Sequence, residues 1–107
     1  MYNGQCHCGA IKFTITATPA QLVDCNCSLC RRLGALWAHV PIESVSIDAL
    51  SDAATSYAQG DRTLAVRTCK HCGCTTHYDS LKESSEIMAV NFRMRAPEVL
   101  SEFRIKA

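Results

Sequence analysis

Residues 25–34 read Cys25-Asn26-Cys27-Ser28-Leu29-Cys30-Arg31-Arg32-Leu33-Gly34, a stretch with three thiols and two guanidinium groups. Two further cysteine groups lie on either side of it, Cys6-His7-Cys8-Gly9 and Cys69-Lys70-His71-Cys72-Gly73-Cys74. Together the three groups contain all eight cysteines of the chain. We therefore expect these cysteines, rather than a large apolar core alone, to organise the fold.

The length of 107 residues predicts one domain, residues 1–107, close to the size at which domains recruit metals or crosslinks for stability. The 11 Lys and Arg against 10 Asp and Glu leave a net charge of +1. This balance gives no broad basic field that would favour nucleic acid or an anionic membrane. A small polar or anionic ligand remains compatible with it.

The first six residues, Met1-Tyr2-Asn3-Gly4-Gln5-Cys6, contain neither a basic segment nor an apolar one of the kind found in secretory signals. No apolar run approaches the roughly 18 residues that span a bilayer. We therefore expect a cytoplasmic protein, in which clustered cysteines favour metal over disulfides. The alternative is a disulfide-rich secreted domain.

The clearest strand is residues 10–16, where Ile11, Phe13 and Ile15 alternate with polar residues. In residues 63–68, Leu64 and Val66 share a face in the same way. Other strands are expected over residues 35–40 (ended by Pro41), 45–47, 75–78 and 87–92, while residues 52–58 are ambiguous. Many short strands predict a small, mainly β fold that carries metal.

Few helical signals are present. Ser28 could cap a single helical turn that ends at Gly34, and Pro97 could open another over residues 97–100. Gly60-Asp61 is typical of a turn, and residues 79–86 of a polar loop.

The outer cysteine groups resemble the two chelating pairs of a structural zinc site. Such a site holds four thiolates or imidazoles in a tetrahedron, supplied by pairs far apart in sequence. Each pair here is followed by glycine, which lets the backbone fold under the sulfurs and direct amides at them. The predicted ligands are Cys6, Cys8, Cys69 and Cys72.

The central group, Cys25, Cys27 and Cys30, has no fourth ligand inside its own stretch. Three protein ligands with one exchangeable position are typical of a reactive zinc, which binds a thiol or water and lowers its pKa. Arg31 and Arg32 would favour an anionic ligand there.

The alternative is that Cys74 completes the central tetrahedron, which would make both zinc sites structural. In an extended chain, however, Cys74 points to the same face as Cys72 and so toward the first site. A bend at Gly73 would remove that constraint.

Among the four histidines, His77 is the best candidate for an acid, a base or a ligand, because it follows the third cysteine group on a predicted strand. His7 and His71 lie inside the cysteine turns, with side chains expected to point outward. His39, beside Trp37, is equally compatible with a half-buried strand position and with a pocket.

The ordered motifs Gly4-x-Cys6-x-Cys8-Gly9, Cys25-x-Cys27-Ser28-x-Cys30-Arg31-x-x-Gly34, Cys69-x-x-Cys72-Gly73 and Val90-Asn91-x-Arg93 resemble one known family. This is the glutathione-dependent formaldehyde-activating enzyme family, which also includes centromere protein V. The resemblance covers the chain from Gly4 to Arg93.

That resemblance implies a β-tent fold with two zinc ions per chain. One is structural, at Cys6, Cys8, Cys69 and Cys72, and the second, at Cys25, Cys27 and Cys30, is catalytic and lies where the sulfur of glutathione approaches. The run Cys74-Thr75-Thr76-His77 differs among members, which leaves the substrate open.

The implied activity is that of a carbon-sulfur lyase, which combines formaldehyde with glutathione or another small thiol. Arg31 would orient a carboxylate of the thiol, and His77 would return a proton to the new hydroxyl. The alternative is a zinc-stapled binding or interaction module without turnover.

Overall fold

The computed structural model describes residues 1–58, 62–82 and 85–107. Within them the strands are β1 (Tyr2–Gln5), β2 (Ile11–Ile15), β3 (Leu22–Val23), β4 (Trp37–Pro41), β5 (Val45–Ala49), β6 (Ala54–Tyr57), β7 (Leu64–Cys69), β8 (Thr75–Ser80), β9 (Ile87–Asn91) and β10 (Ile105–Lys106). The helical elements are α1 (Cys30–Leu33), η1 (Ile42–Ser44), η2 (Phe92–Met94) and α2 (Pro97–Leu100). The prediction of a mainly β fold is confirmed.

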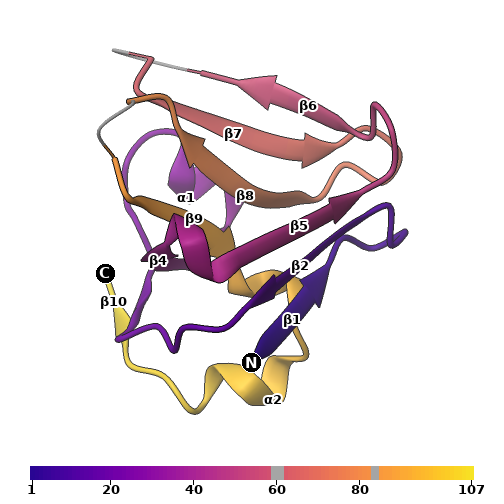
Figure 1. Ribbon diagram of the computed structural model, residues 1–107. Coiled ribbons are helices and arrows are strands. Elements are labelled where there is room, and N and C mark those ends of the chain that lie inside the picture. The colour runs from indigo at the N-terminus through magenta and orange to yellow at the C-terminus, as the bar shows by residue number, and fades with distance from the viewer. Residues whose placement is uncertain (59–61, 83–84) are drawn as a thin grey trace.

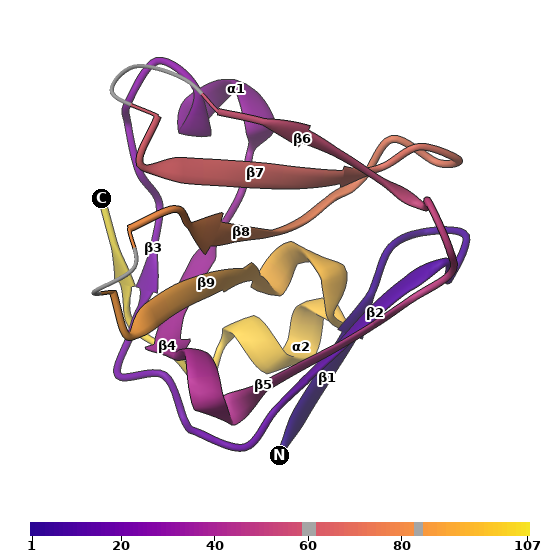
Figure 2. The ribbon, with the colours of Figure 1, turned by 45° about the horizontal axis from the view of Figure 1, so that its top comes forward.

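The described strands form two sheets (Figures 1 and 2). A three-stranded sheet has the order β1-β2-β5, and a seven-stranded sheet has the order β10-β3-β4-β9-β8-β7-β6. Neighbouring strands pair antiparallel except β10 and β3, which are parallel. The chain passes from the small sheet to the large one twice, between β2 and β3 and again between β5 and β6. At the second passage the N–H of Lys70 bonds to the carbonyl of Ala53, and the N–H of Leu50 to that of Ala10, so residues far apart in sequence meet at this corner.

The alternation of β2 places one face of the small sheet against the large sheet. Ile11, Phe13 and Ile15 are buried, whereas Lys12 is exposed. Phe13 and Ile15 pack in one cluster with apolar residues of β3, β4 and β9. The main core therefore lies between the two sheets, as expected when each sheet has one apolar face.

Helix α1 ends as predicted but begins differently. Gly34 terminates it in the left-handed conformation, with φ of 67°. Ser28 does not cap it: the helix begins at Cys30, Leu29 occupies the N-cap, and no side-chain oxygen bonds its first amides. The reason is that the Cys27 thiol accepts the Cys30 N–H at 3.2 Å, which satisfies the amide that a serine cap would bind.

Of the remaining expected elements, some agree with the structure and some differ from it. The ambiguous residues 52–58 contain β6, which pairs with β7, and the expected loop at residues 79–86 is shorter because Asp79 and Ser80 extend β8. Pro97 opens α2 as expected. The predicted turn at residues 60–61 lies outside the described residues.

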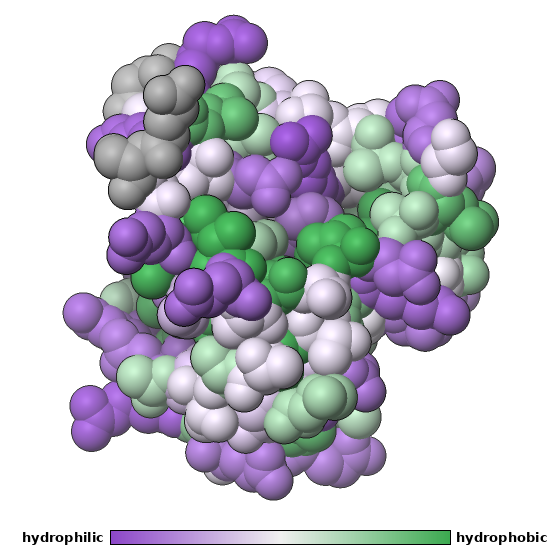
Figure 3. Space-filling view, viewed as in Figure 1, coloured by the Kyte–Doolittle hydropathy of each residue, from purple (hydrophilic) through white to green (hydrophobic). Residues whose placement is uncertain are grey.

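Figure 3 shows one face of the molecule, on which hydrophobic patches lie across the middle and at the right-hand side, with hydrophilic residues between and around them. In the part of the chain that is described, no helix has the length and apolar character needed to cross a membrane.

Candidate metal centres and pocket

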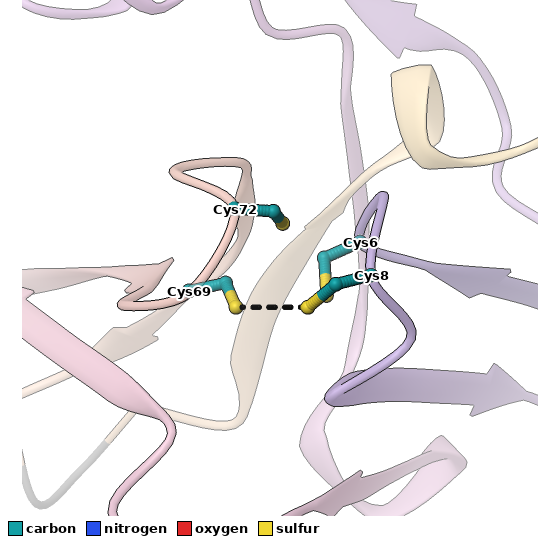
Figure 4. A group of neighbouring side chains, drawn as sticks. All are labelled: Cys6, Cys8, Cys69 and Cys72. Carbon is teal, nitrogen blue, oxygen red and sulfur yellow. Dashed lines mark hydrogen bonds between the residues drawn. The ribbon is translucent and has the colours of Figure 1, made fainter.

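The outer cysteine pairs converge at the corner where the two sheets meet. Cys6 and Cys8 lie in the turn between β1 and β2, while Cys69 ends β7 and Cys72 lies in the turn that leads to β8. Their four Sγ atoms all lie within 4.8 Å of one another. Figure 4 shows the two pairs facing each other from the opposite turns.

The spacing of these sulfurs suits a tetrahedral metal. The Sγ atoms of Cys6 and Cys8 are 3.7 Å apart, and those of Cys8 and Cys69 are 3.6 Å apart. A tetrahedron with Zn–S bonds of about 2.3 Å has S···S edges of about 3.8 Å. The four thiols therefore fit zinc in both number and distance, and no disulfide joins any of the eight cysteines.

Glycines make the two turns possible. Gly9 and Gly73 have φ of 80° and 81°, a conformation that side chains with a Cβ rarely adopt. Their N–H groups donate to the carbonyls of Cys6 and Cys69, at 3.1 and 3.0 Å. Each turn is therefore closed by a hydrogen bond from the N–H of its glycine.

Backbone amides point at the sulfurs of this group. The N–H of Ile11 donates to Sγ of Cys6 at 3.4 Å, and that of His71 donates to Sγ of Cys69 at 3.4 Å. Hydrogen bonds from the backbone amides of Cys72 and His71 lower the pKa of Cys69. Such amides stabilise thiolates, the form in which cysteine binds a metal.

Cys74 belongs beside this first group. The hydrogen bond from the Cys74 backbone amide, and to a smaller extent that from the Cys8 amide, lowers the pKa of Cys72 to about 5. The Cys74 thiol itself is hydrogen-bonded by the backbone amide of His7, and its side chain packs against the cluster. The alternative of a closed second site requires Cys74 to lie beside the central cysteines. In the structure Cys74 lies beside the first group instead.

This position of Cys74 gives a direct prediction. Cys74→Ala should keep the full metal content of the wild type, because the thiol is not one of the grouped ligand atoms. Metal per chain, measured by plasma emission after dialysis, checks this, and Cys30→Ala serves as the control that should lose one metal. If Cys74→Ala loses metal as readily as Cys30→Ala, the second site is closed by Cys74.

The central cysteines form a second group. The Sγ atoms of Cys25, Cys27 and Cys30 lie within 4.8 Å of one another, and no fourth ligand of the described residues joins them. Cys27 is exposed, and the other two are partly buried. Three convergent thiols at the surface could therefore bind a metal and leave one position to another molecule.

The thiols of the second group differ in environment. The backbone amide of Cys30 lowers the pKa of Cys27 to about 7, whereas burial raises the pKa of Cys30 to about 12. The indole Nε1 of Trp37 donates to Sγ of Cys30 at 3.4 Å. This N–H belongs to a buried ring, and it would support a thiolate there.

A pocket of about 370 Å³ opens beside the second group. It lies between the central cysteine stretch and the strands β4, β6, β7 and β8. The lining residues are Val23, Cys25, Cys27, Leu29, Cys30, Trp37, His39, Tyr57, Thr63, Leu64, Val66 and Tyr78. All three central cysteines therefore face a cavity large enough for a small molecule.

Two polar side chains of the pocket lining, one from β4 and one from β8, are hydrogen-bonded to each other across β9. The Tyr78 hydroxyl and Nε2 of His39 are 2.7 Å apart. Burial raises the pKa of Tyr78 to about 12 and lowers that of His39. At neutral pH the pair is therefore an intact phenol hydrogen-bonded to a neutral imidazole, a combination that can pass a proton.

His77 and Arg31 lie elsewhere. His77 is only 5% exposed, and its Nδ1 is 2.8 Å from the hydroxyl of Thr76. Burial lowers the pKa of His77, and the side chain is not among those lining the pocket. Arg31 is exposed on α1 and also lies outside the pocket lining.

The sequence reasoning missed Tyr78. Adjacent residues of a strand point to opposite faces, so Tyr78 and His77 cannot both face the pocket. The register pairs Tyr78 with Ala89 and Val66, and Val66 lines the same pocket. The shared face of Leu64 and Val66 was visible in the sequence, but nothing local showed that Tyr78 lies beside it.

Residues 1–100 match the family model described as glutathione-dependent formaldehyde-activating enzyme. The chain is also similar to the crystal structure of a Rhodobacter sphaeroides protein from a structural genomics programme. That similarity has a TM-score of 0.78 and 30% identity, over 98% of this chain and 100% of the other.

Proposed function

The chain belongs to the glutathione-dependent formaldehyde-activating enzyme family, and on this premise we propose that it joins and separates a small thiol and an aldehyde at the second cysteine group. In the family reaction, the thiol is glutathione and the aldehyde is formaldehyde. The product, S-hydroxymethylglutathione, contains a new carbon-sulfur bond, so the reverse reaction is that of a carbon-sulfur lyase.

The observation that carries this proposal is the opening of the three central thiols into a pocket. We assign a structural zinc to the first cysteine group and a second zinc to Cys25, Cys27 and Cys30. When bound, the second zinc supplies a Lewis acid that lowers the pKa of an incoming thiol, whose thiolate is the nucleophile.

The chain's own residues shape this site. Trp37 holds Cys30 through its indole N–H, and the ring of Trp37 stacks edge-on against Tyr78 with centroids 4.9 Å apart. The Tyr78 hydroxyl and the three central cysteines thus belong to one pocket lining, which would hold a reacting thiol and carbonyl beside a proton donor.

The proton balance of the reaction assigns a role to the Tyr78 and His39 pair. Thiolate sulfur attacks the carbonyl carbon, the C=O π electrons move to oxygen, and that oxygen takes a proton. We assign this donation to the Tyr78 hydroxyl, and the His39 imidazole, whose Nε2 is 2.7 Å from that oxygen, then returns a proton from solvent to the phenolate. Cleavage runs the same steps backwards and returns the proton to the pair.

This assignment replaces the proton role that the sequence favours for His77, because His77 is buried and bonded to Thr76 outside the pocket lining. A carboxylate contact to Arg31 would require a ligand that extends out of the pocket and over α1.

Tyr78→Phe tests the proton role. The substitution removes only the hydroxyl, so exchange between formaldehyde and S-hydroxymethylglutathione should slow by about 100-fold, a typical contribution of a general acid. The rate is measured by NMR exchange spectroscopy and corrected for the uncatalysed background.

Tyr57→Phe is the matched control, since Tyr57 lines the same pocket but is 58% exposed. It should retain the wild-type rate, and both variants should keep their metal. A Tyr78→Phe protein as fast as the wild type would exclude the proposed acid. Wild-type protein with both metals and no accelerated exchange would instead favour a binding module without turnover.

A further inference from the structure

Apolar side chains make up much of the lining of the pocket beside the central cysteines. Val23 of β3, Leu29 before α1 and the pair Leu64 and Val66 of β7 all line it, together with the indole of Trp37. Leu64 is 41% exposed and lies where a ligand can reach it, whereas Val66 and Trp37 are buried. A thiol bound at the cysteines would therefore place its substituent against aliphatic and aromatic side chains.

Charged groups are absent from the described lining of this pocket. Arg31 and Arg32 are exposed on α1, and Arg32 donates to the carbonyl of Ser28 at 2.6 Å. Arg67 follows Val66 on β7, so it points to the opposite face of that strand, and it is paired with Asp79 at 2.7 Å. None of these three arginines is among the residues that line the pocket.

Glutathione carries two carboxylates and one ammonium group, and enclosing such charges without partners is costly. An apolar substituent has no such cost and gains free energy in proportion to the area it buries. Besides the three thiols, the polar side chains of the described lining are His39, Tyr57, Thr63 and Tyr78. All four are uncharged at neutral pH, as in sites where a few polar groups orient a mostly apolar ligand.

From this arrangement we infer that the second cysteine group takes a small thiol with an apolar, aliphatic or aromatic, substituent, or the aldehyde adduct of such a thiol, in preference to glutathione. The inference rests on the proposed function, because it needs a thiol position at the second group. It concerns the substrate class alone, since the aldehyde chemistry is the same for either thiol.

The test compares probes that differ in their substituent. Phenylmethanethiol, 2-mercaptoethanol and glutathione are titrated into protein whose metal has been exchanged for Co²⁺, and sulfur coordination is followed by visible absorption. Trp37, the one tryptophan of the chain, reports occupancy of the pocket by fluorescence in the zinc protein. Phenylmethanethiol should bind at least about tenfold more tightly than the other two thiols.

Leu64→Arg tests the apolar wall directly. It should weaken phenylmethanethiol by about tenfold and strengthen glutathione, because it replaces apolar surface by a partner for carboxylate. Leu81→Arg is the matched control. The exposed fraction of Leu81 is 47%, similar to the 41% of Leu64, but Leu81 does not line the pocket. The control should leave both affinities within twofold of the wild type.

The outcomes separate the two levels of the proposal. If glutathione binds as tightly as phenylmethanethiol, or if Leu64→Arg and Leu81→Arg behave alike, the apolar-thiol inference is wrong and the thiol-binding function stands. If no thiol changes the Co²⁺ spectrum, the function itself fails and takes the inference with it.

Discussion

Cys72→Ser is expected to abolish cooperative folding of the whole chain. The first cysteine group joins the turn between β1 and β2 to the turn between β7 and β8, so it connects the two sheets. Binding of a structural zinc provides on the order of 10 kcal/mol in small domains, against a total stability of about 5–15 kcal/mol. Loss of one ligand from that group should therefore remove most of the free energy of unfolding.

The matched variant is Cys27→Ser in the second group. Cys27 is exposed and its group lies at the pocket rather than between the sheets, so this protein should stay folded and lose one labile metal. Thermal unfolding followed by near-ultraviolet circular dichroism, together with metal content, distinguishes the variants. Equal loss of stability in both would contradict the division into a structural and an open site.

Cysteine chemistry made the metal groups predictable. Short spacings such as Cys6-x-Cys8 and Cys69-x-x-Cys72 place two thiols within reach of one ion whatever the fold, so local sequence is enough to form each pair. That the two pairs meet also followed from the need for four ligands. The alternation of Ile11, Phe13 and Ile15 similarly identified a strand from local pattern alone, and all three are buried.

The edges of the sheets were less predictable. Strand β1 has a glycine at its third position and only one buried residue, and β10 has two residues, both exposed. Such strands show no apolar alternation, and they form because β2 and β3 offer unpaired backbone groups beside them. Their existence depends on partners, which periodicity does not reveal.

The pocket was predictable only in part. The central cysteines and the shared face of Leu64 and Val66 could be found in the sequence, but the meeting of His39 and Tyr78 could not. Those two residues come from β4 and β8, which both pair with β9 but not with each other. A contact across an intervening strand depends on two registers at once, here that of β4 with β9 and that of β9 with β8. A shift of one residue in either register would turn the side chain to the other face of the sheet.

Asn91→Ala is expected to be the most destabilising substitution outside the cysteines. Asn91 is 3% exposed, at the end of β9. Its Oδ1 accepts the N–H groups of Leu36 and Arg93, at 3.1 and 3.0 Å, and its Nδ2 donates to the carbonyl of Thr75 at 2.9 Å. One side chain thus satisfies three backbone groups around the start of β4 and of β8.

Alanine would leave those three groups without this partner. The hydrogen bonds to Leu36 and Thr75 are buried, and each unsatisfied buried group costs about 1–3 kcal/mol. Because relaxation and water recover part of this, we expect a loss of about 3–5 kcal/mol in the free energy of unfolding. Urea denaturation at a fixed zinc concentration measures it, since bound metal adds to apparent stability.

Asn3→Ala is the matched control, because Asn3 is exposed on β1 and its side chain makes none of the hydrogen bonds seen for Asn91. It should change stability by no more than about 0.5 kcal/mol. A loss below about 1 kcal/mol for Asn91→Ala would show that water replaces the amide. A large loss with unchanged thiol affinity would show that the motif Val90-Asn91-x-Arg93 supports the junction of β4, β8 and β9 rather than the chemistry of the pocket.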